Sequence, residues 1–157
     1  LASAVALILG PLQFIRRLRT RRPTWHRWIG RTYLGVGVLE GGLAGLYLAI
    51  HAFGGPVAQL GFAFLAIAWL QTGMLAYLAI REGDVSRHQK WMIRNFALTF
   101  AAVTLRLYLP SSAVAGIDFE TAYPVIAWVC WVPNLLVAER VVRMLPENHA
   151  PALKNRA

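Results

Sequence analysis

The stretch RRLRTRR at residues 16–22 decides the fold of this chain. It separates two apolar segments, a second basic stretch separates two more, and a third follows the last apolar segment. Fifteen of the sixteen Lys and Arg residues fall in these three stretches, which cover residues 16–31, 81–94 and 140–156. Apolar segments of about 20 residues cross a bilayer as helices, and basic clusters mark the loops that join them. The pattern therefore indicates a membrane protein with several spans.

The composition supports this class. The chain of 157 residues is 57% hydrophobic and only 15% charged, whereas soluble domains are about 45–50% apolar and about 25% charged. The net charge of +9 does not indicate nucleic acid, because the basic residues flank apolar segments and form no continuous patch. Orientation in the membrane and contact with anionic lipids explain such charges. We expect membrane lipids as partners, and no nucleic acid.

Five apolar helices are predicted. They cover about residues 1–15, 28–52, 59–80, 89–109 and 122–143. Pro110 is expected to end the fourth helix, because proline cannot continue a helix's hydrogen-bond ladder. The first helix would be about 22 Å long, shorter than the bilayer core of about 30 Å, so we expect it to be truncated, with further residues upstream. The predicted fold is an all-α polytopic membrane helix bundle, with a single transmembrane domain at residues 1–145 and a polar cytoplasmic tail at 146–157.

The charges also predict an orientation. The connections after the second and fourth helices contain no Lys or Arg, and the latter contains Asp118 and Glu120. Because basic loops stay in the cytoplasm, we expect the three basic stretches and the C-terminus inside and Leu1 outside. The expected location is the bacterial cytoplasmic (inner) membrane, as a multi-pass protein.

Arg106 is the one basic residue outside the three stretches, and it falls within the fourth predicted helix. A charge within a span costs at least about 2.5–3.5 kcal/mol on insertion scales, so it usually has a partner. Glu40, near the middle of the second helix, is the candidate. Three interpretations stay open: an ion pair that fixes helix packing, a ligand or proton site built around the pair, and an Arg106 side chain that reaches outward alone.

Helical spacing predicts polar stripes on two helices. At about 100° per residue, His88, Asn95, Thr99 and Arg106 share one face of the fourth helix. On the second helix the positions of His26, Tyr33, Glu40 and Tyr47 recur every seven residues, and Gly37, Gly41 and Gly45 form a ridge that permits close helix packing. Gln71 and Asn134 lie near the middle of their helices. The predicted ligand-binding residues are Arg106, Glu40, Tyr47, Gln71 and Asn134.

His26 and His88 are predicted at the cytoplasmic ends of their helices, at similar depth. Neutral imidazoles on facing helices can ligate haem iron or a transition metal, so haem b or a metal is a candidate cofactor. The alternative is that both are ordinary residues of a wet, basic loop region. His51 falls at the opposite end of the second helix and cannot share their site.

No catalytic motif is present. The chain has no CxxC, HExxH or GxSxG sequence and no Gly-rich phosphate loop after a strand, so nucleophilic and phosphate chemistry have no support. Cys130 lies in an apolar run and is expected to be a small buried hydrophobe. We do not expect an enzyme.

Several ordered motifs resemble one family. They are LGPLQF at residues 9–14, HRWIGRTY at 26–33, HQKWMIR at 88–94, LRL at 105–107 and WVPN at 131–134. They resemble the predicted bacterial membrane proteins catalogued as domain of unknown function 2306, over nearly the whole chain. The resemblance implies a membrane protein without an assigned activity. Members of this family often have further residues before the matched region, with a His on the first helix. The family's layout is loosely similar to four-helix membrane cytochromes of the b561 and ferric-reductase type, which is fold-level analogy.

Three hypotheses follow. In the first, the protein binds a small ligand or a partner without catalysis, for instance as a subunit of a larger membrane assembly, with Arg106 meeting an anionic group. In the second, His26 and His88 bind haem or a metal and the protein passes electrons. In the third, the polar interior only fixes helix packing.

Overall fold

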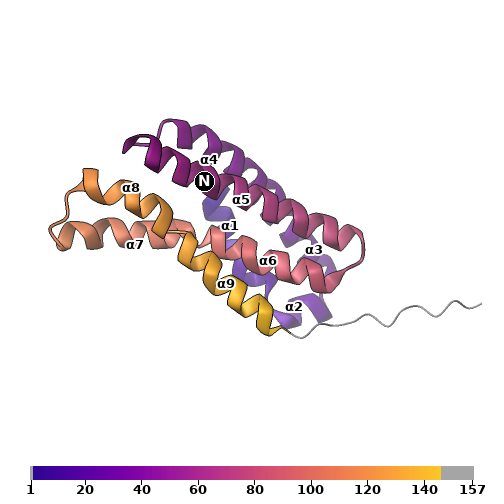
Figure 1. Cartoon of the computed structure of the whole chain (residues 1–157). Coiled ribbons are helices and arrows are strands. Elements are labelled where there is room, and N and C mark those ends of the chain that lie inside the picture. The colour runs from indigo at the N-terminus through magenta and orange to yellow at the C-terminus, as the bar shows by residue number, and fades with distance from the viewer. Residues whose placement is uncertain (1, 146–157) are drawn as a thin grey trace, which may run out of the picture.

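The computed structural model describes residues 2–145, and within that range it contains only helices and turns (Figure 1). Four helical segments are long and apolar enough to cross a membrane, namely Pro23–Ile50, Gly55–Arg81, Val85–Val114 and Phe119–Met144. A shorter apolar helix, α1 (Ala2–Gln13), precedes them. The prediction of an all-α membrane helix bundle is therefore confirmed. The predicted tail at residues 146–157 lies outside the described residues.

The long segments are built from shorter elements. In chain order after α1 these are α2 (Arg16–Arg21), α3 (Pro23–Thr32), the π-helix η1 (Tyr33–Glu40), α4 (Gly41–Ile50), α5 (Gly55–Arg81), α6 (Val85–Thr99), α7 (Ala101–Val114), α8 (Phe119–Val129) and α9 (Val132–Met144). The first span consists of α3, η1 and α4, the third of α6 and α7, and the fourth of α8 and α9. Only the second span, α5, is a single uninterrupted α-helix.

The long helical segments start a few residues before their predicted positions, because proline and acidic residues begin them outside the apolar runs. Pro23 occupies the first turn of α3, where its fixed φ suits a helix and its missing N–H costs nothing. Asp84 and Asp118 cap α6 and α8. Each carboxylate accepts a hydrogen bond of 2.8 Å from a backbone N–H three residues later, on Arg87 and Thr121. Such caps satisfy donors that a helix start leaves unpaired.

The prediction that Pro110 ends the fourth helix is wrong. α7 runs through Pro110 to Val114 and stops before Gly116, whose φ is 73°. Two side chains bond carbonyls of the disturbed turn: Ser111 Oγ donates to Leu107 O at 2.7 Å, and Ser112 Oγ donates to Leu109 O at 2.8 Å. Spanning helices tolerate proline where Ser or Thr side chains bond backbone groups in this way.

A second proline breaks the fourth span. α8 ends at Val129 and α9 begins at Val132, with Pro133 in its first turn. Proline has no N–H to bond the carbonyl four residues earlier. At the break, the carbonyl of Cys130 accepts hydrogen bonds from Asn134 Nδ2 at 2.9 Å and from Thr104 Oγ1 on α7. The break is therefore tied to the neighbouring span.

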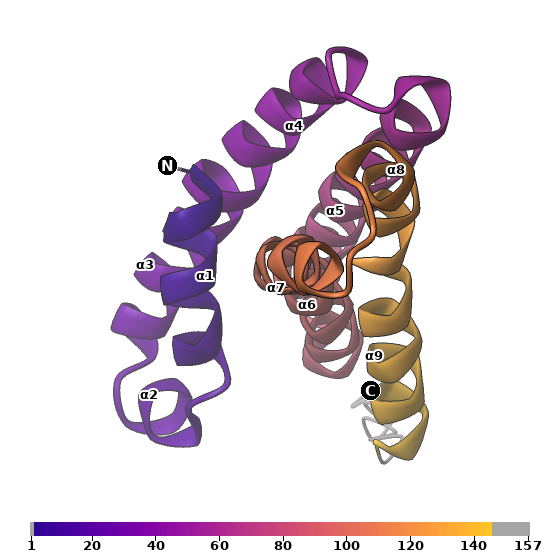
Figure 2. The same ribbon diagram turned by 90° about the vertical axis from the view of Figure 1, so that its left-hand side faces the viewer.

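The helices form two groups, which Figure 2 separates clearly. α1, α3 and α4 make up one group, and α6 to α9 make up the other. α5 packs against α4 and η1 on one side and against α6 and α8 on the other, so it joins the two groups. α1 packs along η1 and also reaches α6.

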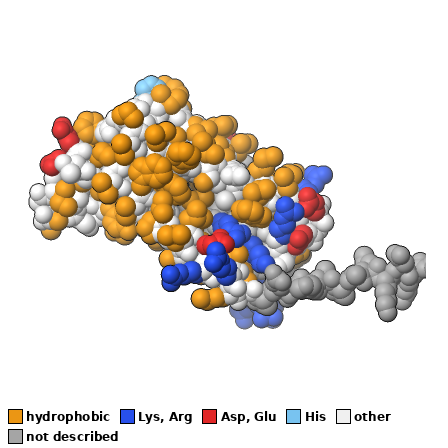
Figure 3. All heavy atoms as spheres, in the orientation of Figure 1, with side chains coloured by type: hydrophobic (Ala, Val, Ile, Leu, Met, Phe, Trp, Pro, Cys, Tyr) orange, Lys and Arg blue, Asp and Glu red, His pale blue; other side chains and the backbone are white. Residues whose placement is uncertain are grey.

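Charge divides the molecule into two ends. Basic side chains gather at one end, while apolar side chains cover most of the body (Figure 3). We call this the basic end; α2, the α5–α6 turn and the end of α9 form it (Figure 1). The α4–α5 and α7–α8 turns form the opposite, far end. The three basic stretches are far apart in the sequence but lie at the same end of the molecule. This is expected for an up-and-down bundle, because its connections lie alternately at the two ends.

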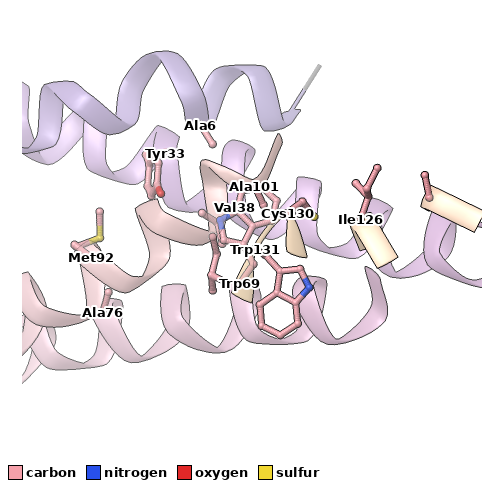
Figure 4. Packing of buried hydrophobic residues seen from close by; sticks show 12 residues of the cluster. Ala6, Tyr33, Val38, Trp69, Ala76, Met92, Ala101, Ile126, Cys130 and Trp131 are labelled. Atoms are coloured by element: carbon pink, nitrogen blue, oxygen red, sulfur yellow. The ribbon is translucent and has the colours of Figure 1, made fainter. Parts of the chain in front are cut away.

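Small residues let the helices approach closely. A Cβ on Gly37 would lie 2.9 Å from the Cβ of Ala6, and a Cβ on Gly10 would lie 2.3 Å from the Phe96 ring. Both distances are shorter than real contacts, so glycine is needed where α1 crosses η1 and α6. Close packing of this kind replaces the hydrophobic driving force that spans lack inside lipid. Figure 4 shows the buried core, to which several helices contribute, among them η1 with Tyr33 and Val38 and α5 with Trp69 and Ala76.

Candidate functional site

A cluster of buried polar side chains lies at the centre of the bundle. Tyr33 Oη donates to Asn95 Oδ1 at 2.7 Å and lies 2.9 Å from Thr99 Oγ1. Asn95 Nδ2 donates to Trp69 O at 2.8 Å and Thr72 Oγ1 at 2.9 Å, and Trp69 Nε1 donates to Thr99 Oγ1 at 2.9 Å. The cluster joins η1, α5 and α6, and its polar atoms have partners. Satisfied buried networks of this kind specify packing, so we assign it a structural role.

The predicted stripe on the second helix ends at Tyr33. Glu40 and Tyr47, seven and fourteen residues later, are both exposed, and 65% of the Tyr47 surface is accessible. The cause is η1, which begins at Tyr33. A π-helix bonds residue i to i+5 and turns less per residue than an α-helix, so the seven-residue repeat no longer returns to one face. A prediction of shared faces that assumes α-helical geometry is therefore wrong for the residues after Tyr33.

The proposed pair of Arg106 and Glu40 does not form. Among the described residues the ion pairs are Arg87–Glu82, Arg94–Glu139 and Arg143–Glu139. Arg106 is exposed on α7, and its Nη1 donates to the carbonyl of Ala102 on its own helix at 2.7 Å. Two of the three interpretations require this pair, so the geometry agrees with the third, an Arg106 side chain that reaches outward alone.

The other predicted ligand-binding residues lie apart. Gln71 is exposed on α5. Asn134 is half-buried on α9, where its Nδ2 donates to Thr104 Oγ1 at 3.2 Å in addition to the Cys130 carbonyl. Within the described residues, no hydrogen bond or ion pair joins any two of Arg106, Glu40, Tyr47, Gln71 and Asn134. The structure therefore does not gather them into one site.

A half-buried ion pair escaped the sequence patterns. Arg94 on α6 donates to Glu139 on α9 from Nε at 2.8 Å and from Nη2 at 3.1 Å, and its guanidinium lies 4.7 Å from the centre of the Trp91 ring. In the sequence, Arg94 is recognisable only as part of a basic stretch. A signal did exist, because Glu139 is a lone carboxylate within an apolar helix, and such a group needs a partner.

The basic end holds the strongest candidate site. His26 is half-buried on α3, and its Nδ1 is buried without a hydrogen-bond partner among the described residues. Gln13, at the end of α1, is only 8% exposed, and its Nε2 is also buried and unpaired. The Gln13 amide lies over Gly30, with Oε1 3.3 Å from the position of an added Cβ. Because Gly30 follows His26 by four residues, both face the same side of α3.

His88 completes this site, which we call the Gln13–His26–His88 site. Its Nδ1 lies 2.8 Å from the carbonyl oxygen of Ala76. A carbonyl only accepts, so Nδ1 carries the proton and Nε2 holds the lone pair in the neutral ring. His88 lies near the start of α6 and His26 near the start of α3, both toward the basic end. The pairing of His26 with His88 stays a prediction, and the structure adds Gln13, which the sequence patterns missed although it lies in the LGPLQF motif.

The apolar spans, the satisfied polar core and the basic end together define a polytopic helical membrane protein. Residues 1–142 match the model of a family described as a predicted membrane protein (DUF2306), and the chain belongs to this family. The resemblance carried by the sequence motifs is therefore confirmed. No curated protein and no solved structure matches the chain.

Proposed function

We propose that this protein binds a small ligand, without catalysis, at the Gln13–His26–His88 site. The observation that carries the proposal is the pair of buried nitrogens, Gln13 Nε2 and His26 Nδ1, that lack partners among the described residues. Buried polar atoms are nearly always hydrogen-bonded, and an unmade bond costs about 1–3 kcal/mol. A ligand that bonds these atoms recovers that free energy. A ligand would recover no such free energy at the central Tyr33 cluster, because the polar atoms there already have hydrogen-bond partners.

The test is native mass spectrometry of the chain purified in mild detergent. We expect a retained small molecule that survives in the Gln71→Met variant and is lost in Gln13→Met. Gln71 is an exposed glutamine, so the two substitutions change the same chemistry at an accessible and at a buried position. Identical adducts in both variants would count against a site at Gln13.

A metal or haem held by His26 and His88 is a second candidate, and the His88 hydrogen bond favours it. Metal-ligating histidines usually donate their other ring N–H to a carbonyl or carboxylate, as His88 does to Ala76. In the described part, no group of three or more His, Cys, Asp or Glu side chains could hold a metal ion, so a metal here would have His26 and His88 as its only ligands of these types. An absorption spectrum and metal analysis of the purified protein distinguish the two candidates. A Soret band or a stoichiometric metal that His88→Phe removes would favour the second.

Exposed charges on the spans favour a place in a larger membrane assembly. Glu40 and Arg106 lie on exposed surfaces of two apolar segments, and charges that face lipid are costly. A second subunit would cover them. Crosslinking in native membranes tests this: cysteines at Glu40 or Arg106 should trap a partner, and a cysteine at Val114, at the far end, should not.

We also propose that the basic end faces the cytoplasm of a bacterial inner membrane, because basic connections are retained inside. Cysteines at Val85 and Ile117, both exposed, mark the two ends of the bundle. In a Cys130→Ala background, a membrane-impermeant maleimide applied from outside should label Ile117→Cys and spare Val85→Cys. The reverse labelling would invert the orientation.

A further inference from the structure

We propose that the ligand of the Gln13–His26–His88 site is the phosphate group of an anionic phospholipid. This inference rests on the proposed function, and it specifies the ligand's chemistry. It depends on three observations: the kind of atoms left unpaired, the charge around them, and the position of α2 and α3 relative to the spans.

The unpaired atoms suit an oxyanion. Gln13 Nε2 is an amide nitrogen, which donates hydrogen bonds and has no lone pair to offer a metal. His26 Nδ1 donates when it carries the proton, and a negatively charged oxygen favours that state. Phosphate oxygens accept from both groups, and hydrogen bonds to a charged acceptor are about twice as strong as neutral ones.

The surrounding charge also favours an anion. Residues 1–39 contain seven Arg and no Asp or Glu. Among the described residues, none of these seven arginines takes part in an ion pair. Arg19 lies on α2, in the basic stretch that leads into α3 and His26. A group of unpaired arginines creates a positive potential that attracts anions and repels divalent cations.

The position of the site points to a lipid as the source of the phosphate. α2 and the start of α3 lie between the apolar helix α1 and the rest of the first span. Trp25 and Trp28 on α3 are each 61% exposed, and exposed tryptophans gather at the headgroup level of a bilayer. Four to eight basic residues beside a span typically bind anionic headgroups. The phosphate nearest to this site is therefore that of the membrane.

Binding requires a local movement. Gln13 Nε2 and His26 Nδ1 are covered in this arrangement, whereas the His26 residue as a whole is only half-buried. In the proposed complex, rotation of the imidazole about its Cβ–Cγ bond turns Nδ1 toward the phosphate, and rotation about the Gln13 side-chain bonds turns the amide to it as well. The free energy lost by two unmade hydrogen bonds favours this rearrangement once an acceptor arrives.

The test measures lipid retention by native mass spectrometry of the delipidated full chain, with phosphatidylglycerol, phosphatidylcholine or inorganic phosphate added. We expect one phosphatidylglycerol per chain, with affinity lowered about fivefold or more in Gln13→Met, His26→Phe and Arg19→Gln. Matched controls change the same residue types elsewhere: Gln71→Met, His51→Phe and Arg140→Gln should bind as the unaltered chain does. Melting temperatures identify any variant that is misfolded, and Gln13→Glu provides a second substitution of similar shape that should repel the phosphate.

Each outcome decides the matter. Equal retention of phosphatidylcholine, or retention that no variant changes, would overturn the inference, because the lipid would then be bound without use of the site. Inorganic phosphate that binds as tightly as the lipid would assign the site to a soluble anion and overturn the lipid source. A different molecule lost in Gln13→Met and His26→Phe would overturn this inference and leave the proposed function standing. If no retained molecule depends on Gln13 or His26, both this inference and the proposed function are wrong.

Discussion

Arg94 and Glu139 join α6 to α9 through two hydrogen bonds, from Nε at 2.8 Å and from Nη2 at 3.1 Å. The Arg94 side chain is 18% exposed and that of Glu139 is 36% exposed. The pair is therefore better shielded from water than Arg87–Glu82, whose side chains are 48% and 58% exposed. Two-point pairing between a guanidinium and a carboxylate fixes geometry as well as charge, so this pair orients the third span against the fourth.

Loss of this pair should destabilise the bundle. Arg94→Ala should lower the free energy of unfolding by about 1–3 kcal/mol, because Glu139 loses charge-assisted bonds in a shielded position. Arg87→Ala, the matched exposed case, should cost less than about 1 kcal/mol. Thermal unfolding in detergent, followed by tryptophan fluorescence, measures both. Equal losses would show that the Arg94 pair acts as an ordinary surface pair.

The hydroxyl of Tyr33 should stabilise the fold. Tyr33→Phe leaves Asn95 Oδ1 buried without its donor, and we expect a cost of about 1–3 kcal/mol. Tyr47→Phe removes a hydroxyl at an exposed position and should leave stability unchanged. If the two variants unfold alike, water enters the central cluster and replaces the lost bond.

Two glycines of the π-helix should respond in opposite ways. A Cβ on Gly37 would meet the Ala6 backbone, with Cα at 3.2 Å and N at 3.3 Å, and backbone atoms cannot move aside cheaply. Gly37→Ala should therefore cost about 1–3 kcal/mol by overpacking. Gly35→Ala meets nothing within 4 Å and should be neutral or slightly stabilising, because alanine favours helices. Melting temperatures of the two variants test the contrast, and a tolerated Gly37→Ala would argue against this contact between α1 and η1.

The cap at Asp118 should make the far end sensitive to acid. The backbone N–H of Thr121 donates to the Asp118 carboxylate at 2.8 Å, and hydrogen bonding to Thr121 holds the pKa of this carboxyl below its usual range. A carboxyl with a lowered pKa in the folded state stabilises above its unfolded pKa, and that contribution is lost as the pH falls through the folded value. Asp118→Asn keeps the capping oxygen but does not titrate. The difference in melting temperature between the unaltered chain and this variant should shrink on acidification, and a difference that stays constant with pH would contradict a contribution from the ionised cap.

The candidate site was only partly predictable. His26 and His88 could be found because both lie on helical faces at the ends of apolar segments. Gln13 could not, since its importance depends on the absence of a Cβ at Gly30, where α1 crosses α3. The predicted grouping of Glu40, Tyr47 and Arg106 failed because the π-helix changes the rotation of everything after Tyr33. A calculation with 3.6 residues per turn cannot anticipate such a change.

The sequence by itself determined the membrane class, the number of apolar helices and the two charged ends. The reason is that the bilayer sets the length of each apolar segment and the placement of charges in the loops, and neither depends on how the helices pack together. The tertiary structure alone decided which polar groups meet: Tyr33 with Asn95 and Thr99, Arg94 with Glu139, and Gln13 beside the face of His26. These contacts depend on how each helix is rotated and where the helices cross. The rotation and crossing are set jointly by close packing at glycines, by Pro110 and Pro133, and by the π-helix. Periodicity places such residues on one face of their own helix, but it does not say which faces of different helices meet.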